Sequence, residues 1–120
     1  MSSRLVIKIT HADDDPERSL VALNVAAAAL ASGLTVSLFL ALDGVRLATP
    51  GSAEHLQIEA SPNGQELLDN VLAGGATLTV CAPCATRRGL VEDHFLKGTI
   101  VAGSGAFVAE IAAGATPLVY

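Results

Sequence analysis

The chain carries little charge for its length. Asp, Glu, Lys and Arg make up 16% of its 120 residues, whereas apolar residues make up 51%. An ordinary soluble domain has about 25% charged residues, so a monomer of this composition would cover its surface poorly. Interfaces between identical subunits are less charged than open surface. We therefore expect part of the surface to pack against other copies of the chain, with an alanine-rich core in an ordinary monomer as the alternative.

Positive charge and long apolar runs are also scarce. The formal net charge is −5, which offers no basic face to a nucleic acid. No apolar run approaches the ~18 residues of a membrane span, and the apolar stretch after Arg4 is too short and too interrupted for a signal peptide. We expect a cytoplasmic protein with neither nucleic acid nor membrane as a partner.

Cysteine is scarce as well. The two cysteines, Cys81 and Cys84, are separated by only two residues, which closes too small a loop to staple a fold. A structural zinc site needs four ligands, and no second C-x-x-C or H-x-x-x-H pair is present. The histidines His11, His55 and His94 are scattered along the chain. The sequence therefore predicts no metal and no cofactor, and it favours chemistry over scaffolding for the cysteines.

Strand and helix patterns alternate along the chain. Asp15, Pro16 and Glu17 have the order of an N-cap, a first helical residue and a first-turn acid, and Gly33 is a usual helix terminator. Residues 43–64 have weak apolar periodicity, so we expect a loop there with a short helix or strand. The alternation predicts one domain over residues 1–120, a flavodoxin-like three-layer α/β/α sandwich with a mostly parallel five-stranded sheet. The expected strands are 4–10, 34–42, 76–81, 99–103 and 116–120; the expected helices are 16–32, 65–72, a short segment after Cys81, and one capped by Ser104.

The stretch VCAPCATRRG, residues 80–89, holds both cysteines and two arginines. The third expected strand ends at Cys81, and Pro83 suits the first helical position, which places Cys84 near unpaired N–H groups and the positive end of the helix dipole. These groups favour the nucleophilic thiolate, and Arg87 and Arg88 add positive charge one turn later. We expect reactive thiol chemistry at the sheet edge, with core packing of the cysteines as the alternative.

Three chemistries use such a cysteine pair. A thioredoxin-type redox pair follows the first strand of its βαβ unit, whereas this pair follows the third expected strand, and a zinc site lacks ligands. Sulfur transfer through a persulfide needs one accessible cysteine of low pKa at an edge where a partner docks. Two other motifs are weaker: GSGAFV (103–108) has Val108 where a dinucleotide fingerprint needs a small residue, and the three acids at 13–15 are best explained as a helix cap.

Two longer stretches carry a resemblance. With DDDPERSLVALNVAAAALASGLTVSLFLALDGV (13–45) followed by CAPCATRRGL (81–90), the chain resembles the DsrE/DsrF-like family, which includes the sulfur-relay subunits of the DsrE and TusD type and the small YchN-like proteins. The likeness covers nearly the whole chain. It implies a cytoplasmic sulfur carrier, and so a sulfurtransferase, in which a cysteine persulfide passes sulfane sulfur from a donor protein to an acceptor protein.

The resemblance also implies roles for the site residues. The persulfide cysteine of the sulfur-relay branch stands six residues before Arg-Arg-Gly, which is the position of Cys81, and in other branches it stands at the position of Cys84. We expect Cys81 as the carrier, Cys84 as a resolving or second thiol, and Arg87 and Arg88 as supporting charges. The family further implies a homotrimer or homohexamer with the cysteines near subunit junctions. A non-catalytic assembly module with structural cysteines and a dithiol redox protein are the alternatives.

Overall fold

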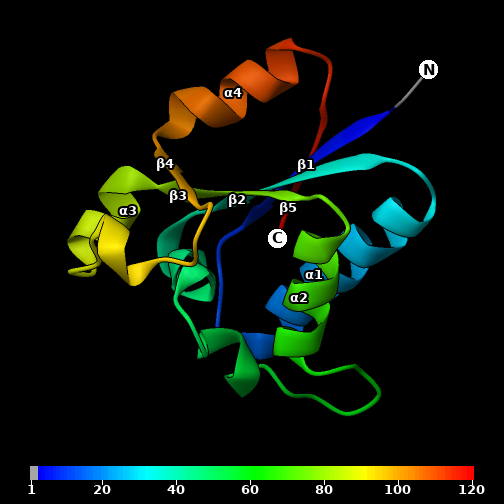
Figure 1. Ribbon diagram of the computed structural model, residues 1–120, viewed down its shortest axis with the longest axis vertical. Helices are drawn as coiled ribbons and strands as arrows, with labels where there is room; N and C mark the ends of the chain where they lie inside the picture. The colour runs from blue at the N-terminus through cyan, green and yellow to red at the C-terminus, as the bar shows by residue number, and fades with distance from the viewer. Residues whose placement is uncertain (1–2) are drawn as a thin grey trace.

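A parallel sheet forms the centre of the computed structural model, which describes residues 3–120 (Figure 1). Its five strands lie in the order β4-β3-β2-β1-β5, and every neighbouring pair is parallel. The strands are β1 (Arg4–Ile9), β2 (Thr35–Leu40), β3 (Thr77–Cys81), β4 (Ile100–Ala102) and β5 (Thr116–Val119). The parallel five-stranded α/β fold predicted from the sequence is confirmed.

Helices connect the strands. The four α-helices are α1 (Pro16–Ala31), α2 (Gly64–Ala73), α3 (Ala82–Arg87) and α4 (Ser104–Ala112). Three short 3-10 helices join them: η1 (Leu42–Ala48), η2 (Ser52–His55) and η3 (Glu92–His94). The region 43–64, where a loop with a short element was expected, therefore contains η2 and most of η1. Helix α4 is capped by the backbone of Gly103, and Ser104 is its first residue instead of the predicted N-cap.

The start of α1 follows the sequence signals closely. The Asp15 side chain accepts a hydrogen bond from the Arg18 backbone N–H, and Pro16 is the first helical residue, where its missing N–H costs nothing. After the helix, Gly33 has a φ of +87°, a left-handed conformation that glycine adopts without strain. These signals set the length of the helix that covers the middle of the sheet.

The helices lie on both faces of the sheet. Figure 1 shows α1 and α2 on one face and α4 on the other. From β1 to β4 the chain steps repeatedly toward one edge, and from β4 it returns to the opposite edge at β5. Connections between parallel strands are right-handed, so a helix lies on one face of the sheet while the chain steps in one direction and on the other face after the chain reverses. The reversal occurs after β4, which is the edge strand beside β3.

The core lies mainly between the sheet and the α1/α2 layer. Five of the six residues of β2 are buried, and Leu20 and Leu23 of α1 are fully buried against the sheet. In contrast, α4 has no fully buried residue although it is rich in apolar side chains. This second face is thus only thinly covered within one chain.

Candidate functional site

The cysteine pair lies where β3 passes into α3. Cys81 is both the last residue of β3 and the N-cap of α3, and Cys84 is the third residue of the helix. Cys81 is in register with Ala102 of β4, the strand from which the chain reverses direction. Ligands and reactive groups of open parallel sheets gather at the carboxyl end of the strands beside such a reversal. The pair lies at a strand-to-helix junction, as predicted, but α3 begins one residue earlier than expected, so Pro83 is its second residue instead of its first.

Both sulfur-bearing side chains are buried within one chain. Cys81 is 4% exposed and Cys84 is 5% exposed, and neither forms a disulfide. An accessible thiol was expected from the sequence, and the single chain does not present one. The reason is local packing, since Cys84 and Ala85 face the core from α3 while Pro83 and Thr86 face outward.

The two thiols have unequal affinities for a proton. Burial raises the pKa of Cys81, and its thiol acts as the proton donor toward Cys84, which raises that pKa further. Burial also acts to raise the pKa of Cys84, but the proton from Cys81, the backbone N–H of Leu42 and the charges of Arg87 and Arg88 outweigh it and lower the pKa overall. Of the two thiols, Cys84 therefore loses its proton at the lower pH.

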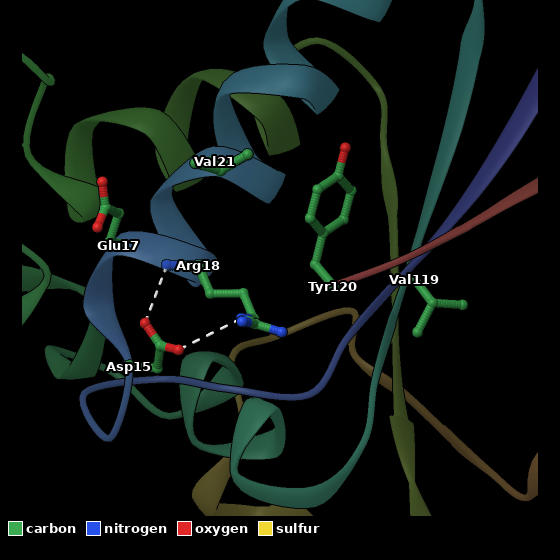
Figure 2. Close-up of a pocket in the computed structure, with 6 residues that line it drawn as sticks. All are labelled: Asp15, Glu17, Arg18, Val21, Val119 and Tyr120. Atoms are coloured by element: carbon green, nitrogen blue, oxygen red, sulfur yellow. Dashed lines mark hydrogen bonds and ion pairs between the residues drawn. The ribbon is translucent and has the colours of Figure 1, made fainter.

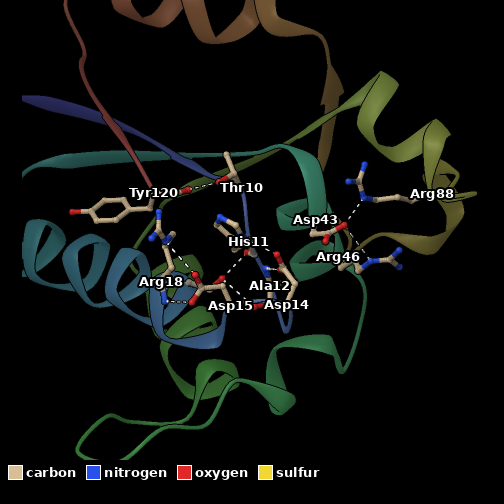
Figure 3. A network of polar contacts seen from close by, with 11 residues as sticks. Thr10, His11, Ala12, Asp14, Asp15, Arg18, Asp43, Arg46, Arg88 and Tyr120 are labelled. Atoms are coloured by element: carbon tan, nitrogen blue, oxygen red, sulfur yellow. Dashed lines mark hydrogen bonds and ion pairs between the residues drawn. The ribbon is translucent and has the colours of Figure 1, made fainter.

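The two predicted arginines have different surroundings. Arg88 is 20% exposed, and its Nε donates to Asp43 Oδ1 at 2.7 Å (Figure 3). Its Nη1 donates to the Cys84 carbonyl at 3.1 Å. Arg87 is exposed, and within residues 3–120 its side chain forms no ion pair or hydrogen bond. Its positive charge contributes to the lowered pKa of Cys84 and partly offsets the raised pKa of Cys81. Arg88 thus holds the site together, while Arg87 is a free charge at its rim.

A turn that the sequence did not assign to the site completes it. Leu42 follows β2 with a φ of +51°, an unusual conformation for a branched side chain, and its N–H is the backbone group directed at the Cys84 sulfur. Asp43 binds Arg88, as above. A Cβ added to Gly44 would lie 2.0 Å from the Ile9 carbonyl oxygen, so only glycine fits there. The sequence DGV, noted only as part of a family resemblance, is the part of this turn that holds Arg88 and touches β1.

The remaining candidate motifs serve the fold. His11 Nδ1 lies 2.7 Å from Asp14 Oδ2, and Asp14 Oδ1 accepts from the Ala12 N–H at 2.7 Å, so these groups order the loop between β1 and α1 (Figure 3). Asp15 caps α1 and pairs with Arg18. Across residues 3–120, no three His, Cys, Asp or Glu side chains gather as metal ligands. None of the helices described is both long and apolar enough to cross a membrane.

A hollow of about 360 Å³ lies away from the cysteines, beside the start of α1 and the end of β5 (Figure 2). None of the predicted site residues lines it. Its walls are Asp15, Glu17, Arg18, Val21, Val119 and Tyr120.

Two relatives have similar sequences over most of the chain. The chain is 36% identical over 98 residues to the uncharacterized protein MK0008 of Methanopyrus kandleri, covering 82% of this chain and 78% of the relative. It is 37% identical over 99 residues to the uncharacterized protein MJ0989 of Methanocaldococcus jannaschii, covering 82% and 83%.

Solved structures share the fold at low sequence identity. A protein of unknown function from Methanobacterium thermoautotrophicum, MTH1491, superimposes with a TM-score of 0.81 at 18% identity, covering 99% of this chain and all of the other. The ychN protein of E. coli superimposes with a TM-score of 0.76 at 20% identity, covering all of both chains. The model of the DsrE/DsrF-like family matches residues 3–119.

Proposed function

Because the chain belongs to the DsrE/DsrF-like family, we propose that it is a sulfur-relay protein that carries sulfane sulfur as a cysteine persulfide between a donor and an acceptor protein. The observation that supports this proposal is the set of groups around Cys84. A core cysteine needs only apolar neighbours, whereas four other groups act to lower the pKa of Cys84: the Cys81 thiol, the Leu42 backbone N–H and the charges of Arg87 and Arg88. All of these stabilise a thiolate, which is the form that attacks a sulfane sulfur.

The proposed roles follow from these contacts. Cys84 attacks the donor and becomes the persulfide, and Cys81 is the second thiol. Sequence reasoning favoured Cys81 as the carrier; we move this role to Cys84 because its pKa is lowered while that of Cys81 is raised. Arg88 holds the Cys84 backbone, and Arg87 supplies an exposed positive charge to an incoming anionic persulfide.

Burial of the pair means that sulfur transfer needs a local opening. The surroundings of the pair are partly open to solvent: Leu42, whose backbone N–H lowers the pKa of Cys84, is 51% exposed. The adjoining residues Pro83 and Arg87 are exposed as well. We expect a docking partner to open this junction between α3 and the turn after β2 and so to reach Cys84 without unfolding the sheet.

Persulfide loading tests this proposal. The reduced protein is incubated with glutathione persulfide without oxygen, freed of small molecules and measured by intact mass and by cyanolysis. We expect Cys81→Ser to gain the mass of one sulfur atom and to release thiocyanate, and Cys84→Ser to do neither. If no variant is loaded under conditions that load a known persulfide carrier, the protein is not a sulfur carrier.

The two alternatives predict different outcomes in the same samples. In a non-catalytic module, which the burial of both sulfurs favours, replacing both cysteines by alanine lowers stability or changes assembly size, and neither single-cysteine variant loads sulfur. In a dithiol redox protein, a Cys81–Cys84 disulfide with a moderate reduction potential forms in the absence of any sulfane donor.

Self-association is the second part of the proposal. Large apolar side chains are exposed on the thinly covered side and at the sheet edges: Ile100, Val101, Val108, Ile111 and Val119. Such side chains, together with the low charge of the chain, suit burial against identical subunits. We propose a cytoplasmic homotrimer or homohexamer that meets its sulfur donor and acceptor as further partners.

A further inference from the structure

The two thiols of the site occupy helix positions whose side chains face each other. The side chain of an N-cap residue is directed back over the first turn toward the third helical residue, which is how capping side chains reach that residue's N–H. Cys81 is the N-cap of α3 and Cys84 is its third residue. The Cys81 thiol is correspondingly the proton donor toward the Cys84 sulfur. Cys81 is therefore a second thiol of the same chain that is held within one helical turn of any group on Cys84.

Burial makes this internal nucleophile more available than an external one. Both cysteines are at most 5% exposed, so a partner thiol must first open the site, whereas Cys81 is already in place. A group held beside its target acts at a high effective concentration, and no diffusional encounter is needed. Unless a partner competes, a persulfide on Cys84 faces attack from within the chain.

We propose that Cys81 resolves a persulfide on Cys84, so that the protein releases its cargo as sulfide when no acceptor is docked. This proposal rests on the proposed function, because it starts from a loaded Cys84. Cys81 first passes its proton to the terminal sulfur of the anionic persulfide, and the resulting Cys81 thiolate is the nucleophile. It attacks Sγ of Cys84, an S–S bond forms between the two cysteines, and the bond from Cys84 to the sulfane sulfur breaks. The leaving sulfur, which already carries the Cys81 proton, takes the bonding electron pair and departs as HS⁻. The sulfane sulfur is reduced to sulfide, and the two cysteine sulfurs are oxidised to a disulfide.

The fate of the bound sulfur then depends on whether an acceptor protein is docked. With an acceptor present, the sulfane sulfur passes outward and the dithiol is conserved. Without one, the chain ends as a Cys81–Cys84 disulfide that a low-molecular-weight or protein dithiol must reduce before the next load. Residues at N-cap and third helical positions lie about one helical turn apart, a separation that a disulfide can span.

The experiment uses the full-length protein and glutathione persulfide, whose own product is glutathione, so that sulfide arises only from the second step. Fully reduced protein is mixed with the probe without oxygen, and sulfide and intact mass are followed over time. For the wild type we expect sulfide in an amount equal to the chains loaded, together with the loss of two hydrogen atoms and no lasting gain of sulfur mass. Cys81→Ser is expected to keep the added sulfur and to release no sulfide above the protein-free sample.

Each other outcome has a distinct meaning. If the wild type keeps its added sulfur as long as Cys81→Ser does, Cys81 is not a resolving thiol, and the carrier function stands. If neither Cys81→Ser nor Cys84→Ser gains sulfur, the proposed function itself is wrong; if only Cys84→Ser gains sulfur, Cys81 is the carrier, and the resolving role of Cys81 is overturned while the carrier function stands. Cys81→Ala gives a second measurement should the serine variant fold poorly, and the helical circular dichroism of each variant identifies such a failure.

Discussion

Arg88 joins the turn after β2 to the cysteine helix. Its Nε donates to Asp43 Oδ1 at 2.7 Å, and its Nη1 donates to the carbonyl oxygen of Cys84 at 3.1 Å. The Arg88 guanidinium thus connects its own helix to a residue 45 positions earlier in the sequence. Since the N–H of Leu42, the residue before Asp43, is directed at the Cys84 sulfur, the same contact holds that amide in place.

Replacing Asp43 by asparagine should weaken the thiolate at Cys84. Arg88 loses its charged partner, so it no longer fixes the turn that carries the Leu42 amide. We expect Cys84 to react with iodoacetamide several-fold more slowly at neutral pH, with the pH profile moved upward. Because the ion pair is partly exposed, the loss in unfolding free energy should be only about 1 kcal/mol. Asp69→Asn on the exposed side of α2 is the matched control, and an equal slowing there would show that the effect is not specific to Asp43.

The pH dependence of alkylation should separate the two thiols. A lowered pKa keeps Cys84 ionised at a pH where an ordinary thiol is protonated, so its reaction persists as the pH falls through the range in which Cys81 is already neutral. Cys81→Ala removes the proton donor, so we expect the Cys84 profile to move to higher pH and the rate at neutral pH to fall roughly three- to tenfold. Peptide mass mapping after a short iodoacetamide pulse at each pH measures both sites. Faster labelling of Cys81 than of Cys84 at neutral pH contradicts the assignment, and Thr86→Ala, on the exposed side of α3, should leave both profiles unchanged.

The strand and helix order could be predicted because its signals are local. Asp15, Pro16 and Gly33 mark the ends of α1 through short-range hydrogen bonds and a single backbone angle. The cysteine pair was also found locally, since a strand end followed by proline indicates a strand-to-helix junction. Local sequence patterns do not distinguish apolar residues of the protein core from apolar residues that are exposed within one chain and suit a subunit interface. The apolar residues of α4 predict a buried helix, yet none is fully buried within the chain.

The rest of the site depends on how two strands align. Leu40 is in register with Val80. Asp43 lies three residues after Leu40 and Cys84 lies four residues after Val80, so both residues leave the sheet at the same level, where Arg88 can contact both. Nothing near Asp43 in the sequence indicates this register. Burial of the thiols likewise depends on which side of α3 faces the core, and a helix of six residues is too short for its periodicity to show that. A polar residue placed just after a strand end is the signal that could have added Asp43 to the candidates.

Substituting Gly44 tests whether the turn is built by close packing. A Cβ at this position meets the Ile9 carbonyl oxygen at 2.0 Å, a backbone atom that cannot move aside without distorting β1. We expect Gly44→Ala to lower the unfolding free energy by about 3 kcal/mol, measured by urea titration, and to slow alkylation of Cys84 because the Leu42 amide is displaced. Gly103→Ala, where an added Cβ has no neighbour within 4 Å, should be nearly neutral. Equal stability of the two variants would mean that the approach of Gly44 to Ile9 is not required.

A lysine on α4 tests the proposed assembly. Val108 is 59% exposed on the thinly covered face, and a charge there would be desolvated if identical chains pack through α4. We expect Val108→Lys to lower the molar mass measured by light scattering after gel filtration, while the circular dichroism of the chain is unchanged. Val21→Lys is the matched control because Val21 is 44% exposed on α1, on the opposite face of the sheet, and it should keep the wild-type mass. If the wild type is a monomer, the shortage of surface charge has another cause; if both variants keep an oligomeric mass, the subunits meet elsewhere than on α4.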